Sequence, residues 1–166
     1  MKLNQGNMKN IKTKSFLFFS LLFLSVNSIY SQDLIYHDKV NTNQLKEIFD
    51  NAYITVVETT DEYVKIKDQS IVYVDVYPTT KYLTLSLTFS LKKDTSKTEI
   101  SELLNKLNKE VVMIKAWYNE ANHSIVFSYY VWLDGGIAPK TFISTVKFFQ
   151  LAMNLALTKD VNKIIL

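Results

Sequence analysis

The sequence predicts an α+β fold in which an antiparallel sheet packs with helices, in the order α-β-β-β-β-α-β-β-α. Strand-like segments occur in two blocks, at 53–91 and 111–133, and segments with helical spacing stand before, between and after these blocks. Adjacent strands with separate helices are typical of α+β domains with an antiparallel sheet. Ten Tyr and ten Phe favour strands, and only three Gly and two Pro argue against disorder.

The first helix is expected to begin after Asn41 or Thr42, either of which can cap it, and to end near Asn51. Apolar residues recur in it at helical spacing, namely Leu45, Ile48, Phe49 and Ala52. Three strands are expected next, at 53–58, 62–67 and 71–77, with turns at 59–61 and 78–80.

The most regular strand is expected at 81–91, where apolar and polar residues alternate strictly. One face carries Leu83, Leu85, Leu87, Phe89 and Leu91, and the other carries Thr84, Ser86, Thr88 and Ser90. This period of two is typical of an antiparallel strand with one face in the core and the other in water.

A second helix, a final hairpin and a third helix complete the predicted domain. Ser96 and Glu99 have the spacing of a capping box, ahead of Ile100, Leu103, Leu104 and Leu107. Strands are expected at 111–118 and 124–133. Pro139 begins the last helix, which runs to about Thr158, and the apolar tail 161–166 either docks as a last strand or frays.

The first 31 residues have the three-part order of a secretory signal peptide. Residues 1–14 contain four lysines, residues 15–26 are a mostly apolar run of 12, and Ser31-Gln32 offers a cleavage point. A membrane-spanning helix needs roughly 20 apolar residues, so the run is shorter than an anchor. We therefore expect a signal peptide at 1–31, starting at Met1 or Met8, and a single domain at 32–166 that is periplasmic or secreted. Contact with the membrane is expected only during export.

The composition of the expected mature chain argues against several classes of protein. Beyond residue 31 there are 15 lysines against 16 acidic residues, a net charge of −1, and the sequence has no Arg. A nucleic-acid-binding protein usually has a basic patch, and Arg is the usual residue for phosphate contacts, so nucleic acid is not an expected partner. The lack of Cys excludes disulfides, thiolate metal sites and a Cys nucleophile.

A run of about 55 residues in the second half carries a characteristic order of motifs. It consists of Leu104-Asn105-Lys106-Leu107-Asn108-Lys109, Ala116-Trp117-Tyr118, Val126 to Leu133, Gly135-Gly136-Ile137-Ala138 and the helix from Pro139. This run resembles the YbjN family. The resemblance implies a fold similar to type III secretion chaperones, in a family of sensory-transduction regulators with no established activity. Many relatives look cytoplasmic, and the expected signal peptide departs from that.

Gly135 and Gly136 are the only glycines of the expected mature chain. We expect them, with Pro139, to form the structural corner between the last strand and the last helix, because Gly permits positive φ and close backbone approach. The alternative is an anion site at the start of that helix. No basic residue lies in the loop, Asp134 would repel an anion, and the spacing fits no Walker or dinucleotide loop.

The last helix has more apolar surface than one core contact needs. One stripe contains Phe142, Ile143, Val146, Phe149, Met153 and Leu157, and a second contains Phe148, Leu151, Ala152 and Leu155. Because a helix at a protein surface usually buries one stripe, the second indicates another subunit, a client segment or the docked tail. The alternative is a helix that is buried on all sides. In chaperone-like relatives of this fold, helix and sheet surfaces support dimers and client binding.

The final hairpin is rich in aromatic residues. We expect Phe127, Tyr129 and Trp117 on one face and Tyr118, Tyr130 and Trp132 on the other. A large apolar patch is not left in water without cost, so one face should meet the helices and the other should contact a partner. The predicted partner-binding residues are Trp117, Tyr130, Trp132, Phe148, Leu151 and Leu155.

The sequence offers few groups for catalysis. His37 and His123 are its only histidines, neither has a partner at metal-ligand spacing, and no catalytic motif is present. We therefore expect no enzyme, no metal and no cofactor. The predicted function is an exported protein-binding domain, chaperone-like or regulatory, that could form a homodimer. The alternatives are a periplasmic small-molecule or lipid-binding module, and an enzyme with clustered carboxylates or His123 in a cleft.

Overall fold

The computed structural model describes residues 33–77 and 79–166, and residues 33–166 form a compact unit. The predicted signal peptide, its cleavage point at Ser31-Gln32 and Pro78 of the predicted turn lie outside the described residues. The described elements are α2 (Thr42–Asn51), β1 (Thr55–Thr59), β2 (Tyr63–Lys67), β3 (Ile71–Val76), β4 (Tyr82–Ser90), α3 (Lys97–Glu110), β5 (Lys115–Asn119), a 3-10 turn (Glu120–Asn122), β6 (Ser124–Trp132) and α4 (Pro139–Lys159). The predicted α+β class and order of elements are confirmed.

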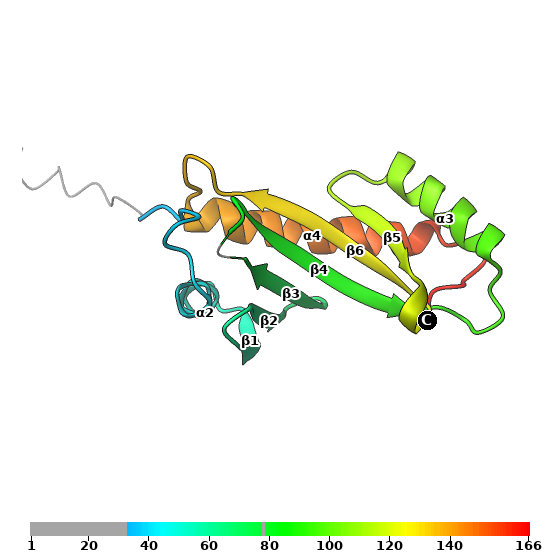
Figure 1. Ribbon diagram of the computed structural model, residues 1–166, viewed down its shortest axis with the longest axis horizontal. Coiled ribbons are helices and arrows are strands. Elements are labelled where there is room, and N and C mark those ends of the chain that lie inside the picture. The colour runs from blue at the N-terminus through cyan, green and yellow to red at the C-terminus, as the bar shows by residue number, and fades with distance from the viewer. Residues whose placement is uncertain (1–32, 78) are drawn as a thin grey trace, which may run out of the picture. The chain divides into compact units, whose positions relative to one another are not determined.

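The described strands form one six-stranded antiparallel sheet in the order β1-β2-β3-β4-β6-β5 (Figure 1). The first four strands form a meander. The chain then leaves the sheet through α3, returns at the far edge as β5, and places β6 between β5 and β4. The β4–β6 pair is the longest, and runs from Tyr82 opposite Trp132 to Ser90 opposite Ser124.

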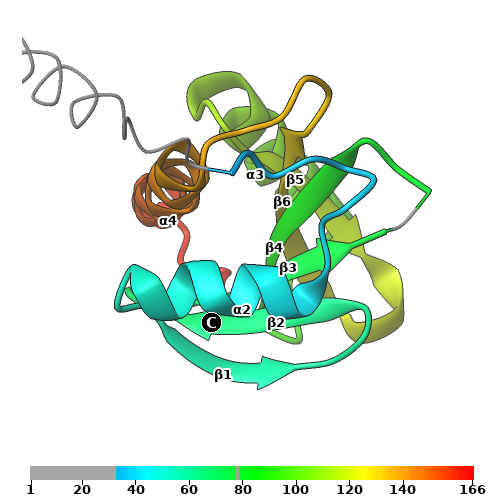
Figure 2. The ribbon, with the colours of Figure 1, turned by 90° about the vertical axis from the view of Figure 1, so that its left-hand side faces the viewer.

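The alternation of apolar and polar residues along β4 shows which face of the sheet packs against the helices. Leu83, Leu85 and Leu87 are at most 5% exposed and point into the core, whereas the residues between them lie on the other face. The helices gather on the core side (Figure 2), where the rings of Phe49 in α2 and Phe142 in α4 have centroids 5.6 Å apart. Full burial of one such large apolar side chain contributes about 1.5–3 kcal/mol, so this face stabilises the fold.

Two helices begin at the predicted caps. The side chain of Asn41, and not that of Thr42, accepts a hydrogen bond of 2.9 Å from the backbone N–H of Gln44 at the start of α2. The capping box of α3 is also present, because the Ser96 hydroxyl accepts from the backbone N–H of Glu99 and the Glu99 carboxylate accepts from the backbone N–H of Ser96. The hydroxyl and the backbone N–H of Ser96 both donate to the Glu99 carboxylate and lower its pKa.

Both ends of the described unit are held by single β-bridges. Ile35 pairs with Ile137, and each backbone N–H donates to the other carbonyl, at 2.8 and 3.0 Å. In the tail, Ile165 pairs with Leu91, and the N–H of Lys92 donates to the carbonyl of Ile164 at 2.9 Å. The tail therefore docks beside the end of β4, which is one of the two outcomes that its sequence allowed.

The strand predicted at 111–118 begins only at Lys115. Helix α3 ends at Glu110, and Met113 has a φ of 63° in the left-handed region, which an extended strand does not contain. Residues 111–114 are therefore a turn between helix and strand. Their apolar character, which suggested a strand, comes partly from Val111, whose side chain joins the core.

Candidate functional site

The sheet face opposite the helices carries a cluster of exposed aromatic side chains. The ring centroid of Tyr82 lies 5.0 Å from that of Tyr130 and 5.4 Å from that of Trp132, with both pairs edge-on. The register explains this cluster, because Tyr82 lies opposite Trp132 and Tyr130 lies opposite Thr84, so that Tyr82 and Tyr130 are diagonal neighbours. The structure thus brings the predicted binding residues Tyr130 and Trp132 together.

Trp117 also lies on this sheet face opposite the helices, which is called the open face below. The prediction that divided the hairpin residues between two faces is therefore wrong for Trp117 and Tyr118. Trp117 pairs with Val126, whereas Tyr118 pairs with the fully buried Ile125. The 3-10 turn at Glu120–Asn122 sets this register, which the sequence of the turn does not specify. Trp117, Tyr130 and Trp132 therefore share one face and are 39–65% exposed.

A shallow hollow of about 460 Å³ opens between these aromatic side chains. Strands β3, β4, β5 and β6 and the β3–β4 turn contribute its described lining, which consists of Asp75, Tyr77, Thr80, Tyr82, Thr84, Ser86, Trp117, Val126, Ser128 and Tyr130. Its volume lies in the range that binds small ligands or a side chain of a partner protein. Most of the lining is aromatic or hydroxyl-bearing, so the hollow can combine apolar contact with hydrogen bonding.

Asp75 is the acidic residue among the described residues of this lining. It lies in β3 between Tyr63 of β2 and Thr84 of β4, and it forms no salt bridge within the described part of the chain. Burial raises the pKa of its carboxyl group, and a hydrogen bond with Ser86 partly opposes this rise. The pKa of the neighbouring Tyr77 hydroxyl is raised by burial and then by the negative charges of Asp75 and Glu62.

On the adjoining part of the open face, basic and acidic side chains are paired with each other. The ammonium group of Lys65 lies 5.2 Å from the ring centroid of Tyr73 and 3.9 Å from the carboxylate of Glu58. The hydroxyl of Tyr63 donates a 3.0 Å hydrogen bond to the same carboxylate, and this hydrogen bond raises the pKa of Tyr63. Lys65 is therefore already paired beside the hollow, in contrast to Asp75.

The outer side of α4 carries the other predicted binding residues. Phe148, Leu151 and Leu155 are 46–57% exposed, and they follow one another along a single helix face. Ala152, which the sequence placed in the same stripe, is buried and belongs to the core instead. The exposed stripe thus consists of three large apolar residues on a different side of the domain from the open sheet face.

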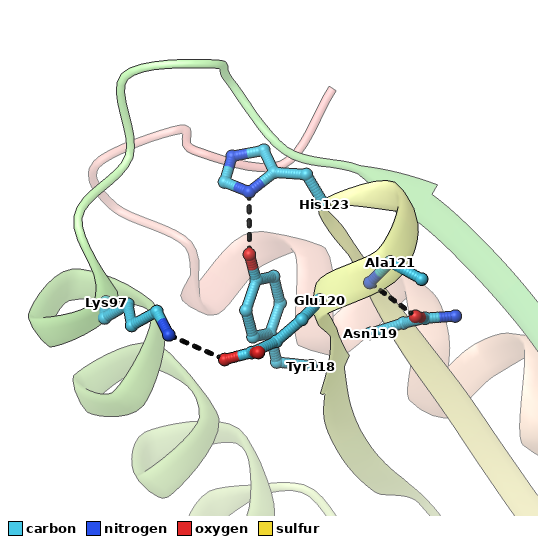
Figure 3. A network of polar contacts seen from close by, with 6 residues as sticks. All are labelled: Lys97, Tyr118, Asn119, Glu120, Ala121 and His123. Atoms are coloured by element: carbon cyan, nitrogen blue, oxygen red, sulfur yellow. Dashed lines mark hydrogen bonds and ion pairs between the residues drawn. The ribbon is translucent and has the colours of Figure 1, made fainter.

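Both ring nitrogens of His123 lie within hydrogen-bond distance of another group. Its Nδ1 lies 2.8 Å from the hydroxyl of Tyr118 (Figure 3). Its Nε2 lies 2.9 Å from the carbonyl oxygen of Lys92. A carbonyl only accepts, so Nε2 carries a proton, and in the neutral ring the Tyr118 hydroxyl donates to Nδ1. The nearby Glu120 is paired with Lys97 at 2.8 Å, and this pairing lowers the pKa of Glu120.

Within residues 33–77 and 79–166, no group of three or more His, Cys, Asp or Glu side chains is placed to hold a metal ion. The helices there are too short or too polar for any of them to span a bilayer.

Comparison with known proteins identifies the family. The family model of YbjN, described as "Putative bacterial sensory transduction regulator", matches residues 41–157. The chain belongs to the YbjN family. The fold is similar to the crystal structure of YbjN, "a putative transcription regulator from E. coli", with a TM-score of 0.67 and 12% identity over 81% of this chain and 99% of the other. No curated protein matches the sequence.

A second solved structure shares the YbjN fold. An uncharacterized protein from Methanothermobacter thermautotrophicus aligns with a TM-score of 0.54 and 10% identity, over 75% of this chain and 99% of the other. At these identities, both structural similarities concern the fold alone.

One of the asparagines that carried the resemblance to YbjN closes the edge of the sheet. The side chain of Asn108 in α3 donates to the carbonyl of Ala116 at 2.9 Å and accepts from its N–H at 2.8 Å. It therefore replaces a neighbouring strand along the outer edge of β5. An uncovered edge favours pairing with another chain, and Asn108 satisfies one backbone donor and one acceptor of this edge.

The double glycine of the YbjN-like run forms the corner before α4. Gly135 and Gly136 have φ values of 84° and 82°, in the region that favours glycine. A side chain at Gly136 would lie 2.7 Å from the ring of Tyr36 and 3.0 Å from Leu34, whereas nothing lies within 4 Å at Gly135. The corner thus leaves room for the segment that precedes α2.

Sequence reasoning predicted the strand at 71–77 that supplies Asp75, but did not include Asp75 among the binding residues. Asp75 and Tyr77 alternate with the buried Val74 and Val76, so they lie on the face of β3 that points away from the core. The missing information was that β4 lies between β3 and β6, which only the sheet order provides.

Proposed function

We propose that this chain is an exported, non-enzymatic regulatory domain that binds a protein partner through the open face of its sheet. The main support is the cluster of Trp117, Tyr82, Tyr130 and Trp132 on a face without a helix. Trp and Tyr are enriched among the residues that dominate protein interfaces. An exposed apolar patch with a polar rim is typical of an interaction site. The description of the family as regulators agrees with a binding role.

Export is supported by the lysine-rich start, the apolar run at 15–26 and the small residue before Gln32. Fractionation of the native cells, with mass spectrometry of the N-terminus, tests this part of the proposal. A processed form in the envelope or medium that begins near Gln32 would support it. An unprocessed cytoplasmic protein would contradict it.

Site-specific photo-crosslinking in the native cells tests the binding face. A photoreactive residue at Trp132 should give one discrete adduct with a protein, because this position lies within the aromatic cluster. The same residue at Val112, which is 80% exposed in the α3–β5 turn, is the matched control and should give no such adduct. Equal labelling from both positions, or none from Trp132, would contradict the proposed binding face.

The exposed stripe of α4 supports self-association as a second contact. We expect the protein to be a dimer at micromolar concentration and Phe148→Lys with Leu151→Lys to make it monomeric, because charges would then replace the apolar contact. Size-exclusion chromatography with light scattering measures this. Circular dichroism should show an unchanged fold, since both side chains are solvent-exposed. An unchanged monomeric mass before and after the substitutions would rule out dimerisation.

A small-molecule or lipid-binding role is the alternative that a second hollow supports. Its volume is about 370 Å³, it lies between α2 and α4, and it is lined mainly by apolar atoms of residues that include Ile48, Ala52 and Ile143. Lys140 and Lys147 also line it, so a ligand with an acyl chain and an anionic group would fit. Extraction and mass spectrometry of the purified protein would reveal such a ligand.

A further inference from the structure

We propose that the hollow on the open sheet face receives a basic side chain of the partner protein, held by the Asp75 carboxylate and by the faces of the surrounding aromatic rings. This inference rests on the proposed function, and it specifies the chemistry of the partner. An arginine is the best match, since its guanidinium group both stacks on aromatic rings and pairs with a carboxylate.

The composition of the hollow supports a cationic guest. Four aromatic residues line it, and Asp75 is the charged member among the ten described lining residues. The negative face of an aromatic ring attracts a cation, most strongly where water is partly excluded. A neutral or anionic guest would leave the carboxylate unpaired or repelled, so the charge and the rings favour the same class of ligand.

The charges around the hollow favour the same guest. Glu62 lies near enough for its charge to raise the pKa of Tyr77, so a second carboxylate adds to the negative potential. The neighbouring cations are partly neutralised, because Lys65 is paired with Glu58, and Lys81 before β4 lies 3.4 Å from Asp134. Lys67 in β2 and Lys115 in β5 remain at the margins of this face, outside the lining.

Asp75 has no salt-bridge partner among the described residues, and this explains why a basic side chain would bind beside it. A partly buried carboxylate without a cation costs free energy, which a bound guanidinium would offset through charge-assisted hydrogen bonds. Because burial raises its pKa, ionised Asp75 lowers stability at pH values above that raised pKa, and this cost disappears as the pH falls and the group is protonated. Asp75→Asn should therefore leave the protein at least as stable at pH 7.

A titration of the purified protein with two tripeptides, followed by NMR, tests the inference. The peptides are acetyl-Gly-Arg-Gly-amide and its citrulline analogue, which has nearly the same shape without the charge. We expect saturable shifts at the Trp117 indole and at Tyr130 for the arginine peptide, and a dissociation constant about tenfold higher for the citrulline peptide. Equal affinity of the two peptides, or no shift at these residues, would overturn the inference.

Two variants and a small cation complete the test. Asp75→Asn should raise the dissociation constant of the arginine peptide about tenfold, whereas Asp94→Asn, in an exposed turn outside the hollow, should not change it. Tighter binding of tetramethylammonium than of the arginine peptide would overturn the choice of a protein side chain. If crosslinks from Trp132 persist while both peptides bind equally, only this inference fails. If the crosslinks are also absent, the proposed function fails with it.

Discussion

Gln150→Met is expected to lower the free energy of unfolding by about 2–4 kcal/mol, because it removes the acceptor of two backbone donors. The side chain of Gln150 in α4 is fully buried, and its carbonyl oxygen accepts from the N–H groups of Gln69 and Ser70 at 2.9 and 3.0 Å. Gln150 therefore holds the β2–β3 turn against α4. Methionine has a similar length, so the loss reflects the missing hydrogen bonds more than a cavity.

Urea denaturation followed by circular dichroism measures this effect. Asn154→Ala is the matched control one turn further along α4, since Asn154 forms one exposed side-chain hydrogen bond with Gln69. It should change the stability by less than about 0.5 kcal/mol, as is usual for a surface substitution. Equal stability of Gln150→Met and the unchanged protein would show that the turn does not depend on this contact.

Gly136→Ala should destabilise the protein clearly more than Gly135→Ala. Both glycines have similar positive φ values, so each substitution carries the strain of a left-handed alanine, about 1–2 kcal/mol. Only at Gly136 would the new methyl group also collide with Tyr36 and Leu34. Overpacking of this kind adds about 1–3 kcal/mol.

The comparison of the two variants isolates the collision, because the backbone strain is shared. Thermal unfolding and denaturant unfolding at pH 7 both measure the difference. If the two variants had equal stability, the segment that contains Tyr36 would not be packed on the corner in solution.

Local signals of the sequence were sufficient to predict the elements and most of their faces. The strict alternation at 81–91 and the capping box at Ser96 gave β4 and α3, since each signal lies within a few residues. The end of α3 was harder to place, because the apolar residues after Glu110 suit a strand as well as a turn. The register of the last hairpin depends on a 3-10 turn that has no clear sequence signature, and for this reason Trp117 was placed on the wrong face.

The candidate site could be predicted only in part, because several of its residues lie far apart in the sequence. Tyr130 and Trp132 were recognised because they are neighbours in one strand. Asp75 and Tyr82 meet them through the pairing of β3, β4 and β6, which joins residues about 50 positions apart. Likewise, Gln150 acquires its role from the β2–β3 turn, so no local pattern distinguishes it from an exposed glutamine.

The affinity of the crosslinked partner for two variants of this protein is the most direct measurement of whether the open sheet face binds. Trp117→Ala removes an aromatic side chain from the lining of the hollow and should weaken the complex at least about tenfold, as is typical of a Trp at the centre of an interface. Val112→Ala removes an exposed side chain away from this face and should leave the affinity unchanged. Unchanged affinity with Trp117→Ala, or an equal loss with Val112→Ala, would contradict a partner-binding role of the open sheet face.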